Sequence, residues 1–202
     1  PWTAEPVGKA ADGSVADVER AIAAARRAFD ETDWGSVENK DKRFALVKKY
    51  RELFEANRDR LAQLAVHEAG AAQAAVNMAH VNMALGGWDD YLAVFDKVTW
   101  EKDYGTREVF GRTHKRVALH EPIGVAALIT PWNVPLYVNI GKVVAALLAG
   151  CTIILKPAPD TPGMGAIFGE LAEQAGFPAG VVNVVFGKDP AEAGEKIGRA
   201  HV

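Results

Sequence analysis

Hydrophobic residues recur at the three- and four-residue spacing of an amphipathic helix near the start of the chain. Ser14 and Asp17 have the spacing of a capping box, in which each side chain bonds the backbone amide of the other residue. The apolar positions that follow lie on one helical face: Val18, Ile22, Ala25 and Phe29. The pattern predicts a first helix that begins just after Ser14.

The same spacing continues to residue 97 and predicts three further helical segments. One begins near Asn39–Asp41 and breaks around Asn57, and the next runs on to Gly70. Residues 72–97 predict one long helix, in which Gly86-Gly87 is a weak point because glycine disfavours a helix interior.

After the helical segments, the sequence pattern changes to a period of two residues, which is typical of a β-strand. From Arg107 to His120, β-branched and charged residues alternate on both sides of the chain. Such a pattern suits solvent-exposed strands or a hairpin better than a buried sheet, because neither side is continuously apolar.

From Gly124 onward, strand and helix patterns alternate. Gly150 has the place of a helix-ending glycine, and Thr161-Pro162 supplies an N-cap and a first-turn proline. Pro190 starts a last short helix. The predicted elements are strand Val125–Ile129, helix Leu136–Ala149, strand Thr152–Leu155, a helix from Thr161 to about Ala175, and strand Val181–Phe186. Repeated strand–helix–strand units imply right-handed crossovers and a parallel, doubly wound sheet.

The fold class is therefore α/β, with N-terminal helices, an extended hairpin and then the parallel sheet. We divide the chain into a helical part (residues 1–106), hairpin strands (107–122) and the βαβαβ segment (123–202).

Composition narrows the function. The 202 residues are 49% hydrophobic and 24% charged with a formal net charge of −3, and acidic and basic residues are mixed, so neither nucleic acid nor an anionic membrane is indicated as a partner. A single cysteine, Cys151, is consistent with a reducing cytoplasm. None of the five histidines has metal-ligand spacing, so no metal is implied. The chain lacks an initial Met, and we expect it to be part of a longer protein.

Ligands of open parallel sheets bind at the carboxyl ends of the strands. Here those ends are the proline-rich segments 130–135, 156–162 and 187–190, and none has the glycine-rich phosphate fingerprint. Three stretches resemble the aldehyde dehydrogenase superfamily in order, wording and spacing: Ile129-Thr-Pro-Trp-Asn-Val-Pro-Leu136, Ala149-Gly-Cys-Thr-Ile-Ile-Leu-Lys-Pro157 and Ala175-Gly-Phe-Pro-Ala-Gly-Val-Val-Asn-Val-Val185. The resemblance implies a Rossmann-like cofactor domain that binds NAD or NADP and an aldehyde substrate.

Asn133 is the catalytic candidate. By composition alone it is more often a helix N-cap, whereas the resemblance implies that its amide donates to the oxygen of a tetrahedral thiohemiacetal. The resemblance further implies the cofactor-binding residues Ile129, Thr130, Pro131, Trp132, Asn133, Lys156, Ala158, Pro159, Pro190 and Gly194.

Lys156 ends a buried strand, where an ammonium needs an anion or a hydroxyl as its partner. A surface salt bridge is one alternative, and the resemblance instead implies bonds to the adenosine ribose. The family often has a glutamate three residues after this lysine, but this sequence has Pro159 there, followed by Asp160. Without that carboxylate the preference between NAD and NADP stays open.

Other residues take structural or substrate roles by resemblance. Val134, Tyr137, Val138 and Gly141 match positions that line an aldehyde tunnel, and the small Val134 and Gly141 favour a wide one. Lys142 is expected to have a structural role near the site. Cys151 begins an interior strand, so we interpret it as structural rather than as the nucleophile.

By resemblance, the nucleophilic cysteine and the general-base glutamate lie beyond residue 202, so these residues alone are expected to be inactive. The hairpin strands 107–121 resemble a family element that joins subunits, which implies a homodimer or homotetramer. Two alternatives remain open: a non-catalytic nucleotide-binding or assembly module, and a CoA-acylating member of the family.

Overall fold

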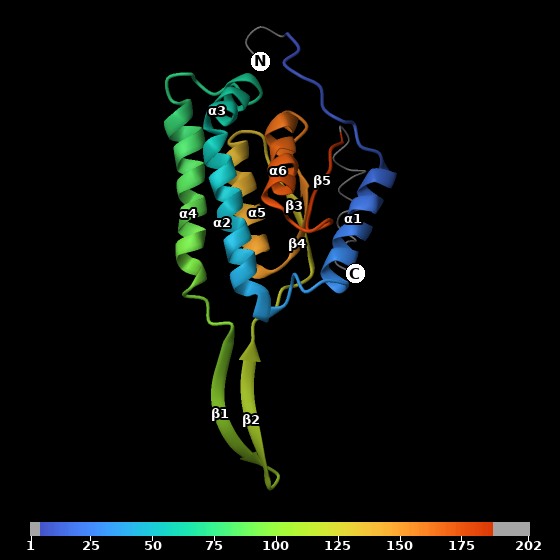
Figure 1. The fold of residues 1–202 in the computed structure, drawn as a ribbon, viewed down its shortest axis with the longest axis vertical. Coiled ribbons are helices and arrows are strands. Elements are labelled where there is room, and N and C mark those ends of the chain that lie inside the picture. The colour runs from blue at the N-terminus through green and yellow to red at the C-terminus, as the bar shows by residue number, and fades with distance from the viewer. Residues whose placement is uncertain (1–4, 188–202) are drawn as a thin grey trace.

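The computed structural model describes residues 5–187, which form an α/β body with an antiparallel hairpin projecting from it (Figure 1). The predicted fold class is confirmed, because helices come first, then the hairpin, then a parallel sheet with helices on both faces. The short helix predicted at Pro190 lies outside the described residues. Within residues 5–187, no helix combines the length and the apolar character needed to cross a membrane.

The elements follow one another along the chain in the order α1 Val15–Asp30, η1 Val37–Asn39, α2 Lys40–Ala56, α3 Arg58–His67, η2 Asn77–Asn82, α4 Met83–Phe95, β1 Glu101–Val109, β2 Arg112–Leu119, β3 Val125–Ile129, α5 Pro135–Ala149, β4 Thr152–Lys156, α6 Pro162–Ala175 and β5 Val182–Val184. Of these, η1 is a 3-10 helix and η2 is a π-helix.

The parallel sheet has the order β3-β4-β5, with Val125 paired to Thr152 and Ile153 paired to Val182. The helices α5 and α6 are the crossovers between these strands, as the alternation of strand and helix patterns predicts. All five residues of β4 are buried, since this strand is the central one. The carboxyl ends of the three strands therefore meet at one edge of the sheet.

Two apolar layers cover the two faces of the sheet. The side chains of Ile153 and Leu155 belong to the main core, which α2, α4, α5 and α6 share. Ile154 points to the other face and packs with Val18 and Ala25 of α1. This alternation along β4 places α1 alone on one side and the other large helices on the opposite side (Figure 1).

Local sequence signals set two of the helix ends. Ser14 and Asp17 form the predicted capping box, with the Ser14 amide donating to Asp17 Oδ2 at 2.7 Å. Gly150 ends α5 with a left-handed φ of 94°, a conformation that favours glycine because it has no Cβ. The predicted break at Asn57 is confirmed, since α2 ends at Ala56 and α3 begins at Arg58.

The prediction of one long helix over residues 72–97 is wrong at its start. Residues 71–75 are turn and irregular structure, and the helix begins with the π-helical turns of η2 before continuing as α4. Gly86 and Gly87 lie inside α4 without a break. The buried positions Val76 and Val81 are five residues apart, a spacing that suits a π-helix better than an α-helix, but one such pair is too short a pattern to predict a π-helix.

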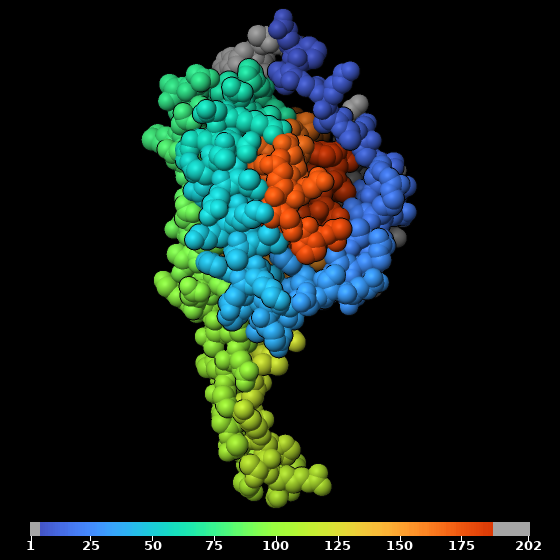
Figure 2. Space-filling model, in the orientation of Figure 1, coloured from blue at the N-terminus to red at the C-terminus, as the bar shows by residue number. Residues whose placement is uncertain are grey.

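The hairpin is longer than the sequence predicts. Its first strand begins at Glu101, ahead of the predicted start at Arg107, and the two strands turn at Phe110-Gly111. Residues 101–106 show no apolar alternation, because almost every hairpin residue is exposed, and this hides the strand in the sequence. Figure 2 shows the hairpin of β1 and β2 projecting from the α/β body.

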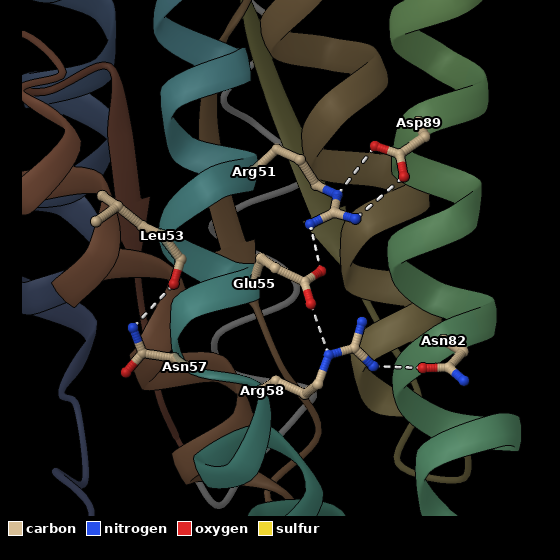
Figure 3. A network of polar contacts seen from close by, with 7 residues as sticks. All are labelled: Arg51, Leu53, Glu55, Asn57, Arg58, Asn82 and Asp89. Carbon is tan, nitrogen blue, oxygen red and sulfur yellow. Dashed lines mark hydrogen bonds and ion pairs between the residues drawn. The ribbon is translucent and has the colours of Figure 1, made fainter.

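A polar network fastens α2 to α3 and α4 at the surface (Figure 3). Arg51 of α2 makes a two-pronged ion pair with Asp89 of α4, with both N–O distances at 3.0 Å, and donates to Glu55 at 2.9 Å. Arg58 of α3 donates to the other Glu55 oxygen at 2.7 Å and to Asn82. One carboxylate thus accepts from two arginines on consecutive helices.

We expect the contribution of Glu55 to depend on pH. The hydrogen bonds from Arg58 and then Arg51 lower the pKa of Glu55 below its ordinary value of 4.5. The stabilisation is therefore full at neutral pH and is lost as the pH falls through the lowered pKa. Glu55→Gln should reduce the free energy of unfolding at pH 7 by no more than about 1 kcal/mol, because the site is partly exposed.

Urea unfolding at pH 7 and at pH 3 checks this expectation. Glu52→Gln, on the exposed face of the same helix, is the matched control and should have no effect at either pH. An equal loss of stability for Glu55→Gln at both pH values would contradict the assignment.

Candidate functional site

Three chain segments lie at the carboxyl edge of the parallel sheet, one after each strand. The Thr130 amide donates to the Lys156 carbonyl at 3.2 Å, and the Val185 amide donates to the Leu155 carbonyl at 2.9 Å. These bonds extend the sheet pairing by one residue and hold the starts of the loops side by side. The sheet therefore brings together the residues that the sequence places after β3 and β4.

The loop after β3 presents most of its side chains to solvent. Ile129, Pro131, Trp132 and Asn133 are exposed, whereas Thr130 is buried and its hydroxyl has no partner among the described residues. The N-cap position of α5 is Val134, and no side chain caps this helix end. Asn133 thus does not act as the N-cap that its composition alone favours.

Lys142 connects α5 to the end of β3. Its Nζ donates to the Ile129 carbonyl at 2.6 Å, across a separation of 13 residues that includes the whole exposed loop. Because the Ile129 carbonyl is the last of the strand, this bond holds the middle of α5 to the end of β3. This contact lies beside the candidate site.

Lys156 is the last residue of β4, and only 3% of its surface is exposed. None of the ion pairs among residues 5–187 includes it, so the surface salt bridge considered from sequence is not observed. An ammonium that is withdrawn from solvent needs a polar partner. Lys156 thus ends β4 at the sheet edge without an ion-pair partner among residues 5–187.

The loop after β4 borders a pocket of about 220 Å³. Ala158 is half-buried, while Pro159 and Asp160 are exposed, and a turn is closed by the Thr161 amide donating to the Ala158 carbonyl at 3.2 Å. The pocket lies between this loop, the end of β5 and the N-terminal segment, and its lining is Ala10, Ala11, Asp12, Pro157, Pro159, Pro162, Phe186 and Gly187.

The N-terminus of α6 is capped by a residue from another helix. Thr161 has the predicted N-cap position, but its side chain makes no capping bond. Instead the Glu68 carboxylate accepts from the Gly163 amide at 2.7 Å and from the Met164 amide at 2.9 Å. Burial raises the pKa of Glu68 from its ordinary value, and the two amide bonds partly oppose this. The sequence does not indicate this contact, because its partners are far apart along the chain.

A second pocket, of about 300 Å³, lies between α4 and α5. The predicted tunnel residues Tyr137, Val138 and Gly141 line it, and Val134 does not. Gly87 and Tyr91 of α4 form the opposite wall. A Cβ at Gly141 would lie 3.6 Å from the Tyr91 hydroxyl, so the glycine leaves room that a larger side chain would fill.

Cys151 lies away from both pockets, at the start of β4. It is buried, and this burial raises the pKa of its thiol. Because the thiolate is the reactive form, this environment disfavours a nucleophile. Among residues 5–187, no cluster of three or more His, Cys, Asp or Glu side chains could hold a metal ion. The predicted cofactor residues Pro190 and Gly194 lie outside the described residues.

Comparison with known proteins identifies the family. The model of the aldehyde dehydrogenase family matches residues 1–201. The chain is 38% identical to human mitochondrial succinate-semialdehyde dehydrogenase, over 96% of this chain and 36% of that protein. It is 36% identical to an aldehyde dehydrogenase of Enchytraeus buchholzi, over 93% of this chain and 37% of the relative.

A solved structure agrees with these matches. The Mycobacterium tuberculosis aldehyde dehydrogenase complexed with NAD+ superposes with a TM-score of 0.85 at 34% identity, covering 95% of this chain and 38% of that one. The order of the helices and the parallel sheet define a doubly wound α/β domain. Within that fold class, the chain belongs to the aldehyde dehydrogenase family. It spans well under half the length of these relatives.

Proposed function

We propose that the protein containing this chain oxidises an aldehyde to a carboxylic acid with NAD or NADP. The observation that carries the proposal is Lys156, a residue only 3% exposed and without an ion-pair partner among the described residues, at the sheet edge where such folds bind nucleotides. Family membership supports the reaction class, and the NAD+ bound to the Mycobacterium tuberculosis relative supports the cofactor. The attacking thiol belongs outside residues 1–202, since Cys151 is buried.

The residues at the sheet edge fit a dinucleotide. Lys156 offers an ammonium to the ribose of the adenosine, Pro157 and Pro159 line the pocket beside it, and Ala158 lies between these two prolines in the chain. The exposed residues Ile129, Pro131 and Trp132 and the backbone of the buried Thr130 face the nicotinamide end in this assignment. When bound, the nicotinamide accepts a hydride from the substrate.

Asn133 supplies the oxyanion donor in this proposal. Its side chain is exposed at the sheet edge, and α5 does not use it as a cap, so the amide is free to orient toward a ligand. An uncharged N–H donor stabilises the negative oxygen that develops when a nucleophile attacks the carbonyl. The residue acts without changing its own charge.

Replacing this donor tests the assignment. Asn133→Ala should lower kcat by about 10²-fold or more, because loss of one oxyanion donor costs roughly 2.7–4 kcal/mol of transition-state stabilisation. Steady-state kinetics and circular dichroism of the native protein measure turnover and folding. Near-normal turnover in a folded variant would rule the role out.

Pro159 governs the choice between NAD and NADP in this proposal. A carboxylate at this position repels a 2′-phosphate, and proline removes that repulsion. Pro159→Glu should therefore shift the ratio of kcat/KM for NAD over NADP toward NAD by about tenfold or more, equal to about 1.4 kcal/mol. Asp160→Asn is the control for the neighbouring charge. An unchanged ratio in Pro159→Glu would contradict the assignment.

The pocket between α4 and α5, which Tyr137 and Gly141 line, is the proposed entrance for the aldehyde. Gly141→Phe should lower kcat/KM for bulky aldehydes more than for acetaldehyde, because the new ring fills the space in front of Tyr91. Ala145→Phe, exposed on the same helix outside this pocket, is the control. An equal loss for small and bulky substrates would count against the tunnel.

We also propose that the hairpin joins a second copy of the protein. An isolated two-stranded ribbon has little stability of its own, and both outer edges of β1 and β2 lack strand partners among the described residues. Light scattering should give the native protein a mass of two or four chains. A native mass of one chain at micromolar concentration would contradict the proposal.

A further inference from the structure

Glu68 joins the end of one helix to the beginning of another. Its backbone amide closes α3 as the C-cap residue, donating to the Leu64 carbonyl at 2.9 Å. Its carboxylate uses one oxygen for the Gly163 amide and the other for the Met164 amide of α6. A negative charge is unfavourable at the C-terminus of α3 but favourable at the N-terminus of α6. The position of the Glu68 carboxylate therefore stabilises α6 and not α3.

The contact is closely fitted. A Cβ at Gly163 would lie 2.6 Å from Glu68 Oε1 and 3.0 Å from Leu64 Cδ2, so α3 approaches α6 at a position where a side chain would intrude. Thr161 does not compete with Glu68 for the α6 amides, because the Thr161 hydroxyl makes no capping bond. The first turn of α6 depends on Glu68 for its amide partners.

The segment between β4 and α6 is the one that borders the proposed cofactor site. At its β4 end, the Thr130 amide holds the Lys156 carbonyl at 3.2 Å. At its α6 end, the Glu68 carboxylate holds the Gly163 and Met164 amides. Residues 157–161 are therefore fixed at both ends, and Ala158 and Pro159 lie between the two fixed points.

The same contact occupies the anion position at this helix end. In many doubly wound folds, a phosphate accepts from the amides at a helix N-terminus after a strand. Here a carboxylate of the protein accepts from two of those amides, so the first turn of α6 is not open to a cofactor phosphate. The cofactor would instead meet the outer surface of the loop.

We propose that Glu68 is a positioning residue for cofactor binding, holding residues 157–161 so that Lys156, Ala158 and Pro159 face the adenosine. This inference rests on the proposed dinucleotide function. Glu68 acts through the loop and does not itself contact the cofactor or the reacting atoms. Its removal should weaken cofactor binding and leave the chemical step largely intact.

A second link between the same helices provides a matched control. Arg60 of α3 makes a two-pronged ion pair with Glu170 of α6, at 2.7 and 2.8 Å, on the exposed surface. Glu170→Gln weakens the attachment of α3 to α6 without touching the first turn of α6. It separates a general loosening of the two helices from the specific capping contact.

The test measures cofactor KM and kcat for the native protein, with NAD and NADP as the probes and an aldehyde at saturation. Glu68→Gln keeps the shape but turns an amide donor toward one of the two backbone amides. We expect its cofactor KM to rise by at least about fivefold, the size of effect expected from losing a helix cap, with kcat changed by less than about twofold. Glu170→Gln should leave the cofactor KM unchanged.

Gly163→Ala is the second variant, and it decides the question if Glu68→Gln fails to fold. It keeps the carboxylate but pushes it away from α6, so it should raise the cofactor KM in the same direction. An unchanged cofactor KM, or a lower kcat at constant KM as expected from a smaller folded fraction, would overturn the positioning role alone. A wild-type protein that binds neither NAD nor NADP would overturn the proposed function together with this inference.

Discussion

The central strand β4 is fully buried and ends in the charged residue Lys156, and the arrangement of the other elements depends on this constraint. The five residues of β4 are all buried between α1 on one face and the main helical core on the other. Its last residue, Lys156, is only 3% exposed and has no ion-pair partner among the described residues, and withdrawing an unpaired ammonium from water is costly. The neighbouring strands, the loops after them and the helices that follow all lie around that edge.

Contacts from distant parts of the chain hold this edge. Lys142 binds the end of β3, the Thr130 amide binds the end of β4, and Glu68 binds the beginning of α6. Each contact fixes one boundary of a loop whose middle is exposed. A site built in this way has little to rearrange when a ligand binds, since the loop ends are already ordered.

The sequence predicts the parts of the fold that depend on neighbouring residues. The Ser14–Asp17 capping box, the left-handed Gly150 and the strand pattern of β3 and β4 are local signals, and the structure contains all of them. Residues 101–106 of the hairpin and the π-helical start of the helix before α4 lack such a signal. Exposed strands need no apolar alternation, and one pair of buried valines five residues apart is too short a pattern to predict a π-helix.

In the candidate site too, the sequence predicts some residues and not others. The sequence motifs and the positions at strand ends predict Asn133 and Lys156 as site residues, because ligands bind at the strand ends of a parallel sheet. Glu68 could not be predicted from the sequence, since it contacts Gly163 and Met164 only after α3 has packed on α6. Thr161 illustrates the difference, because sequence gives it the N-cap position and the tertiary fold gives the capping bonds to Glu68.

The most direct test of the account is a crystal structure of the native protein with NAD bound. We predict that Lys156 Nζ lies at hydrogen-bond distance, about 3 Å, from an adenosine ribose hydroxyl, with the α6 amides still bound to Glu68. A cofactor bound away from this edge, or a Lys156 ammonium paired with a carboxylate of the protein, would contradict it.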